Sequence, residues 1–297
     1  MKLTEHYMLP KALLISFFYY SISLHAAETI KTIYHFSNEP IDVVIPCHEK
    51  DVRTLDLAIK GIRENGKNIG EIFVISAKQL THLAKWVPEK IFPFSKNDLV
   101  PEIAHFDQER IRELLPCYWL GWIYQQLLKL YAPFIIRGIS SNVLIVDADV
   151  IFLNETEFMD AAGNPYFNYG TEGYHAEYFE HAAKLIDEPF SIKRVFPEIP
   201  GICHHMLMQK VVLQDLFEKI EKKHVLPAWK ALCRCINWEH IQHSCMSEYE
   251  IYFNFIFSRT DQAKLRFLKY DDLAYHDGIE KQYKKLGYSY IACHSWK

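Results

Sequence analysis

Short β-branched runs and amphipathic segments alternate along the chain from about residue 41. Residues 41–46 form an apolar run that ends at a proline, which predicts a buried strand. Residues 51–65 place apolar side chains at i, i+3 and i+4 and end at an Asn-Gly pair, which predicts a helix. Residues 69–76 form a second apolar run. The order strand, helix, strand predicts a parallel βαβ unit.

The later segments continue this alternation. Residues 119–134 have the period of a strong helix, and residues 142–146 form a buried strand. Residues 155–200 have no clear period, so we expect a variable excursion over a site. The other predicted elements are a strand at 201–208, a helix from about 211, a helix that opens at 247 and a possible strand at 265–268. Because no repeat, low-complexity tract or convincing linker is visible, we predict one α/β domain over residues 28–297.

The first residues have the layout of a targeting segment. Lys2 and Lys11 precede an apolar run over residues 12–24, and Ala26 and Ala27 follow it. This layout is typical of a signal peptide, which we assign to residues 1–27. A short, uncleaved membrane anchor is the second interpretation, and a buried or surface helix is the third. The segment predicts an exported or secretory location, or membrane association through the N-terminus.

Composition excludes some classes of function. The net charge of -4 and the absence of any Lys/Arg run argue against a nucleic-acid partner. The seven cysteines are odd in number and irregularly spaced, so they do not form a disulfide framework. Cys233, Cys235 and Cys245 lie near two histidines, but their spacing matches no common zinc module. We therefore expect buried thiols.

The main chemical feature follows the strand at residues 142–146. This apolar run delivers Asp147 and Asp149 to its C-terminal end, where open α/β sheets place their ligand sites. Two neighbouring carboxylates repel each other and are costly to desolvate, and a hard divalent cation relieves both problems. Mn²⁺ and Mg²⁺ prefer oxygen ligands and are often shared with substrate phosphates. The D-x-D motif therefore predicts nucleotide-sugar transfer in which the cation stabilises the leaving nucleotide.

Several segments, taken in order, resemble one family. They are residues 42–51 (DVVIPCHEKD), 121–130 (GWIYQQLLKL), the D-x-D strand, 204–208 (HHMLM) and 247–252 (SEYEIY). Together they cover about residues 41–257, and the chain resembles the DUF6492-like group of GT-A-fold glycosyltransferases. The resemblance implies a GT-A-like, Rossmann-like fold whose mixed, mostly parallel sheet is flanked by helices. It also implies a nucleotide-diphosphate sugar as donor and a glycan, lipid or protein as acceptor.

The resemblance implies nucleotide contacts at two places. Pro46, His48 and Asp51 follow the first strand, where such folds hold the base and ribose, although a capped turn would also explain His48. Gln126 and Lys129 lie one turn apart on the helix that leads to the D-x-D strand. Lys129 is expected to meet the diphosphate, and the alternative is a solvated lysine on the helix face.

The metal and sugar contacts are implied in the same way. Asp149 is expected to ligate the metal directly, and Asp147 to ligate it or to hold the ribose or a metal-bound water. His294 is the expected third ligand, with His276 as its competitor. Because side chains alternate along a strand, only one of the pair at residues 204–205 can face the site, and we favour His205 as the sugar contact.

A catalytic carboxylate is expected at the start of the last strong helix. Ser247 and Glu250 have the spacing of a capping box, which gives Glu250 a structural explanation. Glu248 then occupies the first helical position, free to point into the cleft. An inverting transferase needs a general base, and we predict Glu248 for this role, with Glu250 second. The alternative is an acid that the helix dipole favours.

Two other classes of function are open. In a haloacid-dehalogenase-like phosphatase Asp147 would be the nucleophile. Ile151 stands where such enzymes usually carry Thr or Val, and the motif lies far from the start of the domain. A catalytically inactive carbohydrate-binding relative is the other class, and the intact carboxylates argue against it. The signal-like N-terminus is compatible with a cytoplasm-facing anchor, a secretory organelle or delivery into a host cell.

Overall fold

A five-stranded sheet forms the centre of the molecule, in a computed structural model that describes residues 31–171, 173–243 and 245–294. Its strand order is β3-β2-β1-β4-β7. β1, β2, β3 and β4 are parallel, and β7 runs antiparallel to β4. The strands are β1 (Ile41–Pro46), β2 (Ile69–Ser76), β3 (Lys85–Pro88), β4 (Asn142–Val146) and β7 (His205–Gln209).

Both faces of this sheet are covered, which explains the continuous apolar runs of β1 and β4. Alternate side chains enter different cores: Val44 and Ile145 belong to one, and Val43 and Leu144 to the other. The first core contains α4 (Tyr118–Ile135), α6 (Lys210–His224) and α8 (Glu248–Arg259). The second contains residues of α1 (Val52–Asn65) and side chains of a smaller sheet that is described below.

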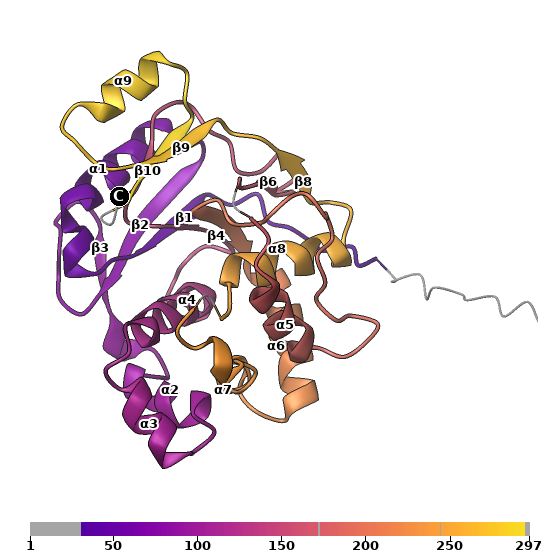
Figure 1. Cartoon of the computed structure of the whole chain (residues 1–297). Helices are drawn as coiled ribbons and strands as arrows, with labels where there is room; N and C mark the ends of the chain where they lie inside the picture. The colour runs from indigo at the N-terminus through magenta and orange to yellow at the C-terminus, as the bar shows by residue number, and fades with distance from the viewer. Residues whose placement is uncertain (1–30, 172, 244, 295–297) are drawn as a thin grey trace, which may run out of the picture.

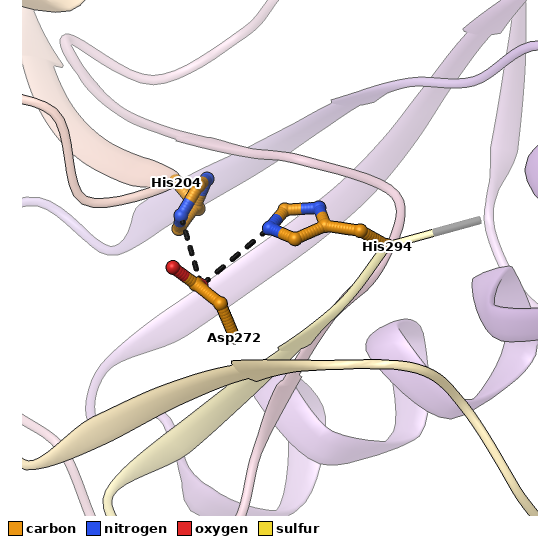
Figure 2. Close-up of side chains that lie close together, drawn as sticks. All are labelled: His204, Asp272 and His294. Carbon is orange, nitrogen blue, oxygen red and sulfur yellow. Dashed lines mark ion pairs between the residues drawn. The ribbon is translucent and has the colours of Figure 1, made fainter. Parts of the chain in front are cut away.

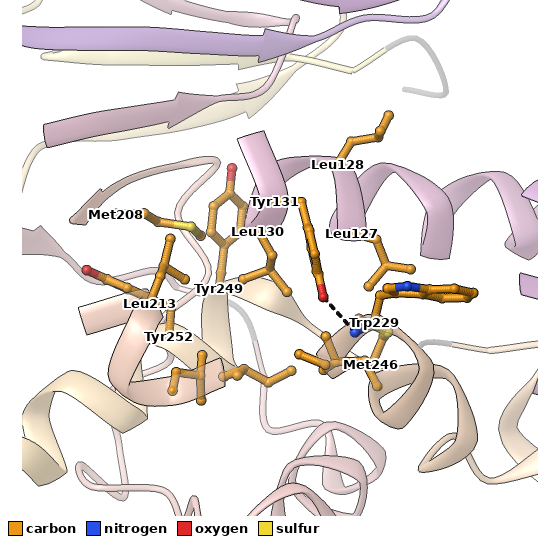
Figure 3. Packing of buried hydrophobic residues seen from close by; sticks show 14 of the residues in the cluster. Leu127, Leu128, Leu130, Tyr131, Met208, Leu213, Trp229, Met246, Tyr249 and Tyr252 are labelled. Carbon is orange, nitrogen blue, oxygen red and sulfur yellow. Dashed lines mark hydrogen bonds between the residues drawn. The ribbon is translucent and has the colours of Figure 1, made fainter. Parts of the chain in front are cut away.

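The helical side of the sheet is packed mainly by aromatic and leucine side chains. Figure 3 shows α4 with Leu127 and Leu130 directed toward residues of α7 and α8. The Tyr131 hydroxyl accepts a hydrogen bond of 2.8 Å from the backbone N–H of Trp229, at the start of α7 (Ala228–Arg234). This contact fixes α4, which carries two of the predicted site residues, against the rest of the domain.

The smaller sheet brings the end of the chain back to the centre. Its order is β5-β10-β9, from β5 (Val150–Phe152), β10 (Tyr290–Cys293) and β9 (Tyr270–Leu273). β10 is antiparallel to β5 and parallel to β9. Since β5 directly follows the D-x-D residues, this pairing places residues near 294 beside residues near 149.

The remaining elements surround these two sheets, as Figure 1 shows, with α9 beside the small sheet and the α4–α8 helices on the opposite side of the central strands. A parallel pair joins β6 (Tyr166–Asn168) to β8 (Lys264–Arg266). The other helices are α2 (Lys96–Ile103), α3 (Gln108–Leu114), α5 (Ala176–Leu185), α9 (Ile279–Lys285) and the 3₁₀ turns at Glu49–Asp51, Glu89–Ile91 and Trp238–His240. Within the described ranges, no helix has the length and apolarity needed to cross a membrane.

The architecture confirms the expected α/β fold class with a mixed, mostly parallel sheet flanked by helices. The strand predicted at 201–208 is shorter, because His204 has a left-handed backbone (φ 62°) and the strand begins after it. The excursion at 155–200 contains β6 and α5. The predicted segment at residues 1–27 lies outside the described residues.

Candidate active site

The D-x-D residues form a tight turn between β4 and β5. The backbone N–H of Val150 donates to the carbonyl of Asp147 (3.1 Å), and the N–H of Asp147 donates to the carbonyl of His204 (3.0 Å). The Thr54 hydroxyl in the first turn of α1 donates to the carbonyl of Ala148 (3.1 Å). The turn is therefore held by α1 on one side and by the residue that precedes β7 on the other. Its two carboxylates have different neighbours.

Asp147 lies in a buried ion network. Its Oδ1 is 2.6 Å from Lys129 Nζ, and the same ammonium is 2.6 Å from Glu248 Oε1. The Tyr249 hydroxyl donates to Asp147 (3.3 Å), and His204 Nδ1 lies 3.7 Å from Asp147 Oδ2. One lysine thus neutralises charge on two carboxylates that come from distant segments.

Burial and charge act against each other in this network. Burial alone would raise the pKa of Asp147, but Lys129 and His204 outweigh it and hold that pKa below its ordinary value. Burial alone would lower the pKa of Lys129, but Asp147 and Glu248 raise it. The pKa of Glu248 is raised, chiefly by burial, and Lys129 only partly opposes this. Lys129 is therefore a permanent cation in this position.

Asp149 is directed toward the end of the chain. Its Oδ2 lies 3.0 Å from His294 Nδ1, and its carbonyl accepts a hydrogen bond of 2.9 Å from the N–H of Cys293. The N–H of His294 donates to the carbonyl of Leu273 on β9 (2.9 Å). Strand pairing of β10 with β9 therefore sets the position of His294.

Figure 2 shows that two histidines and a third carboxylate, Asp272, lie close together. One of these histidines, His294, is the residue that contacts Asp149. His204 Nε2 lies 3.2 Å, and His294 Nε2 lies 3.5 Å, from Asp272 Oδ1. One ligand atom from each of His204, Asp272 and His294 lies within 4.8 Å of the other two. Nitrogen and carboxylate oxygen donors at this spacing fit a divalent transition metal.

In this cluster the histidines and the carboxylates shift each other's pKa values in favour of the charged forms. Burial lowers the pKa of His204, but the carboxylates of Asp147 and Asp272 raise it to about 10. Burial likewise opposes a raised pKa at His294, and Asp149 and Asp272 bring it to about 9. The pKa of Asp272 is held below its ordinary value although burial would raise it, because both imidazoles are close. The cluster thus carries positive charge among its carboxylates.

A pocket of about 410 Å³ opens at the carboxyl end of β1, and its lining residue Asp51 interacts electrostatically with Asp149 of the D-x-D turn. Pro46, His48 and Asp51, the residues put forward as nucleotide contacts, all line this pocket. The pKa of Asp51 is raised, mainly by burial, and Asp149 contributes to this shift, so the two carboxyls influence each other. The other wall includes Tyr118, Trp122, Tyr124, Lys50, Glu89 and Lys96.

The helix residues predicted to meet the nucleotide face elsewhere. Gln126 Oε1 accepts a hydrogen bond of 2.9 Å from the N–H of Glu248, and Gln126 is buried. Lys129 is buried as well and binds the two carboxylates described above, which excludes the alternative of a solvated lysine. Both residues face the inner side of α4, whereas Gly121, Trp122 and Gln125 of the same helix line the pocket.

The orientation of the histidine pair corrects our preference for His205. His205 is buried among Phe152, Phe158 and Tyr290, its Nδ1 lies 3.0 Å from the carbonyl of Cys203, and burial lowers its pKa to about 3. His204 faces the carboxylates instead. Alternation along an ideal strand could not decide this, because His204 precedes the strand in a left-handed conformation.

The two glutamates of α8 are also placed differently from the prediction. Glu248 is 3% exposed and paired with Lys129, so it is not free to point into a cleft. Ser247 caps the helix as predicted, since its hydroxyl accepts from the N–H of Glu250 (3.2 Å). The Glu250 carboxylate accepts hydrogen bonds from the N–H of Gly201 (3.1 Å) and from Asn254 (2.8 Å). Both carboxylates thus hold helices and loops together, and neither is placed as a general base.

Two outcomes remain for the late part of the chain. His294 rather than its competitor His276 reaches the carboxylates, since His276 is exposed. Asp272 was not among the predicted metal ligands, because only the register of β9 against β10, which pairs it with Ala292, brings it there. Cys233, Cys235 and Cys245 are buried thiols, as expected.

Comparisons with known proteins address the family and the fold. Residues 31–280 match the model of the Family of unknown function (DUF6492). No curated protein gives a significant match. The chain is similar to the apo form of mouse xyloside xylosyltransferase 1 (9% identity, 86% of this chain, 98% of that chain, TM-score 0.41). It is also similar to an active-site mutant of LgtC (10% identity, 85% and 86%, TM-score 0.37) and to the bifunctional glycosyltransferase WbbM (12% identity, 88% and 47%, TM-score 0.41).

Proposed function

We propose that this chain, which belongs to the family of unknown function DUF6492, is a metal-dependent glycosyltransferase with a nucleotide-diphosphate sugar as its donor. The observation that best supports this proposal is the meeting of Asp149 and His294 within 3.0 Å, beside the pocket at the carboxyl end of β1. In open α/β sheets, ligands bind at the carboxyl ends of the strands. Candidate metal ligands and a pocket of this volume near the same edge of the sheet therefore support the proposal.

The metal site of the proposed enzyme lies beside Asp149 and His294. A bound Mn²⁺ or Mg²⁺ would act as a Lewis acid that neutralises charge on the departing nucleoside diphosphate. Carboxylate oxygen and imidazole nitrogen both suit a divalent cation. Lys129 already balances the charge of Asp147 and holds it in place (2.6 Å), so the turn that carries Asp149 is rigid before the donor binds.

The pocket suits the nucleoside part of the donor. Its volume of about 410 Å³ lies within the usual range for small-molecule sites. Tyr118 and Trp122 offer aromatic faces for a base, and His48 and Asp51 offer polar atoms for the ribose. Lys50 and Lys96 offer cationic groups for phosphate oxygens in a lining that also holds Asp51 and Glu89. The proposed acceptor group is a hydroxyl, carried by a glycan, a lipid or a protein.

Nucleotide binding measured by calorimetry tests this proposal. UDP, GDP, UDP-glucose and GDP-mannose are titrated into the wild type with and without Mn²⁺, and into Asp149→Ala. We expect one nucleotide to bind at least ~10-fold more tightly with Mn²⁺, and Asp149→Ala to remove this difference. The exposed His276→Ala is the matched control and keeps wild-type binding.

The outcome that contradicts the proposal is the absence of binding by all four nucleotides in the presence of metal. In that case a phosphatase assay with Asp147→Asn decides the alternative. The wild type would hydrolyse a phosphomonoester and the variant would not, since Asp147 would then be the nucleophile.

A further inference from the structure

The two carboxylates of the D-x-D motif have unequal freedom to ligate a cation. Asp147 Oδ1 is bound at 2.6 Å by the buried Lys129, whose ammonium also binds Glu248. Drawing Asp147 away toward a metal would leave this buried ammonium with one partner, which is costly in a desolvated site. The negative charge that Asp147 would bring to a metal must therefore come from another carboxylate.

Asp272 supplies a carboxylate at the right place. Asp272 lies on β9 and is paired with Ala292 of β10. Ala292 in turn precedes His294 by two residues. The Nε2 atoms of His204 and His294 approach the same oxygen, Asp272 Oδ1, at 3.2 and 3.5 Å. Figure 2 shows the two rings directed at this carboxylate from different elements. Three ligand atoms thus converge on one small volume, within 4.8 Å of one another.

His204 gives an independent indication of a ligand. The residue is 8% exposed, and its Nε2 is buried without a hydrogen bond of ordinary geometry, although it lies 3.2 Å from Asp272 Oδ1. Buried polar atoms are nearly always satisfied in folded proteins. An imidazole nitrogen that faces a carboxylate and a second imidazole, without a hydrogen bond of its own, is suited to a metal ion.

The D-x-D carboxylates lie on the opposite sides of both rings. Asp149 Oδ2 is 3.0 Å from His294 Nδ1, and Asp147 Oδ2 is 3.7 Å from His204 Nδ1. Metal-binding histidines usually donate their second ring N–H to a carboxylate, which fixes the tautomer and the ring orientation. His294 has this partner at hydrogen-bond distance, and Asp147 lies at ion-pair distance from His204.

We propose that Asp272, His204 Nε2 and His294 Nε2 form the direct metal-binding triad, and that Asp147 and Asp149 orient the two imidazoles. The triad names the ligands of the metal in the proposed function. Only the catalytic role of the bound cation rests on that function, and metal binding itself does not. Because two of its three donors are imidazole nitrogens, the site favours Mn²⁺ and other transition metals over Mg²⁺. Asp147 and Asp149 are positioning residues in this scheme.

Metal binding by the full chain without any nucleotide tests the triad. Mn²⁺ is titrated by electron paramagnetic resonance, and pulsed measurements on the bound ion detect coupling to imidazole nitrogen. We expect nitrogen coupling in the wild type and binding of Mn²⁺ at least ~10-fold tighter than that of Mg²⁺. This spectrum needs no variant, so it stays informative if a variant fails to fold.

Variants then separate ligands from positioning residues. Asp272→Asn and His204→Gln are expected to weaken Mn²⁺ binding by ~100-fold or more, whereas Asp149→Asn, which keeps an acceptor for His294 Nδ1–H, weakens it by ~10-fold. Asp271→Asn is the matched control for Asp272, because Asp271 lies next to it on β9 and instead accepts from the Tyr283 hydroxyl (3.0 Å). This control binds Mn²⁺ as the wild type does.

Opposite results overturn the triad. Wild-type affinity in Asp272→Asn, bound Mn²⁺ without nitrogen coupling, or no Mn²⁺ binding at millimolar concentration would each contradict it. If metal-dependent nucleotide binding persists in Asp272→Asn, the triad fails and the proposed function stands. If the triad binds Mn²⁺ and no nucleotide binds, the proposed function fails and the triad stands.

Discussion

At the scale of single residues, Lys129 links three parts of the chain that are far apart in sequence. It lies on α4, and its ammonium binds Asp147 after β4 and Glu248 at the start of α8. The sequence identified all three residues as candidates, because carboxylates after a strand and at a helix start are recognisable patterns. It could not predict that they bind each other, since the contact depends on how α4 packs against α8.

Replacing Lys129 tests how much its ion pairs contribute to the free energy of unfolding. Lys129→Met leaves the buried Glu248 and the partly buried Asp147 without their shared cation, so we expect a loss of about 3 kcal/mol in the free energy of unfolding, measured by urea denaturation. In the double variant Lys129→Met/Glu248→Gln one of those charges is also removed. The double variant should recover part of the loss, and a single variant as stable as the double one would contradict this account.

At the scale of elements, the strong periodic segments were predictable and the short late strands were not. β1, α1, β2 and β4 follow from apolar runs and helical spacing, and they place the D-x-D turn at the sheet edge. β9 and β10 have four residues each, and β9 is only partly buried, so no clear alternation marks it. For that reason the sequence did not indicate Asp272 as a metal ligand and left His294 and His276 as competitors.

Two helical glycines should respond oppositely to the same substitution. A Cβ on Gly61 of α1 would lie 2.8 Å from the carbonyl oxygen of Phe152, so Gly61→Ala forces α1 away from β5. We expect it to lose about 1–3 kcal/mol of stability, despite alanine's higher helix propensity. Gly121→Ala meets only Lys96 Nζ at 3.9 Å and should gain up to about 1 kcal/mol. Denaturation of both variants checks the signs, and stabilisation by Gly61→Ala would refute the close approach.

At the scale of the whole molecule, acid stability depends on a histidine outside the site. His181 of α5 is 1% exposed, and its Nε2 lies 2.9 Å from the carbonyl of Leu232 of α7. Burial lowers its pKa from 6.5 to about 4. Between these values the unfolded chain binds a proton that the folded chain does not, so stability falls as the pH decreases through this window.

Removing this imidazole should make the acid side of the stability curve less steep, and the buried His205 keeps its own contribution to the slope. From pH 7 to pH 5 the wild type is expected to lose about 2 kcal/mol more stability than His181→Gln. The reason is that over most of this range the unfolded wild type binds one more proton than the folded protein does. Urea denaturation at both pH values gives the two differences. His276→Gln removes an exposed imidazole and is the control. Equal losses in wild type and His181→Gln would show that the buried histidine does not set the acid limit.

The position of β10 between β5 and β9 has a consequence for how the protein folds. Ile291 pairs with Ile151, a residue 140 positions earlier in the chain, and this pairing sets His294 beside Asp149. Contacts of such high sequence separation form slowly, because the entropy of closing a long loop is lost before the contacts can stabilise the chain. The central sheet can assemble from β1, β2 and β4 before this closure. Recovery of metal affinity during refolding should therefore lag behind recovery of secondary structure.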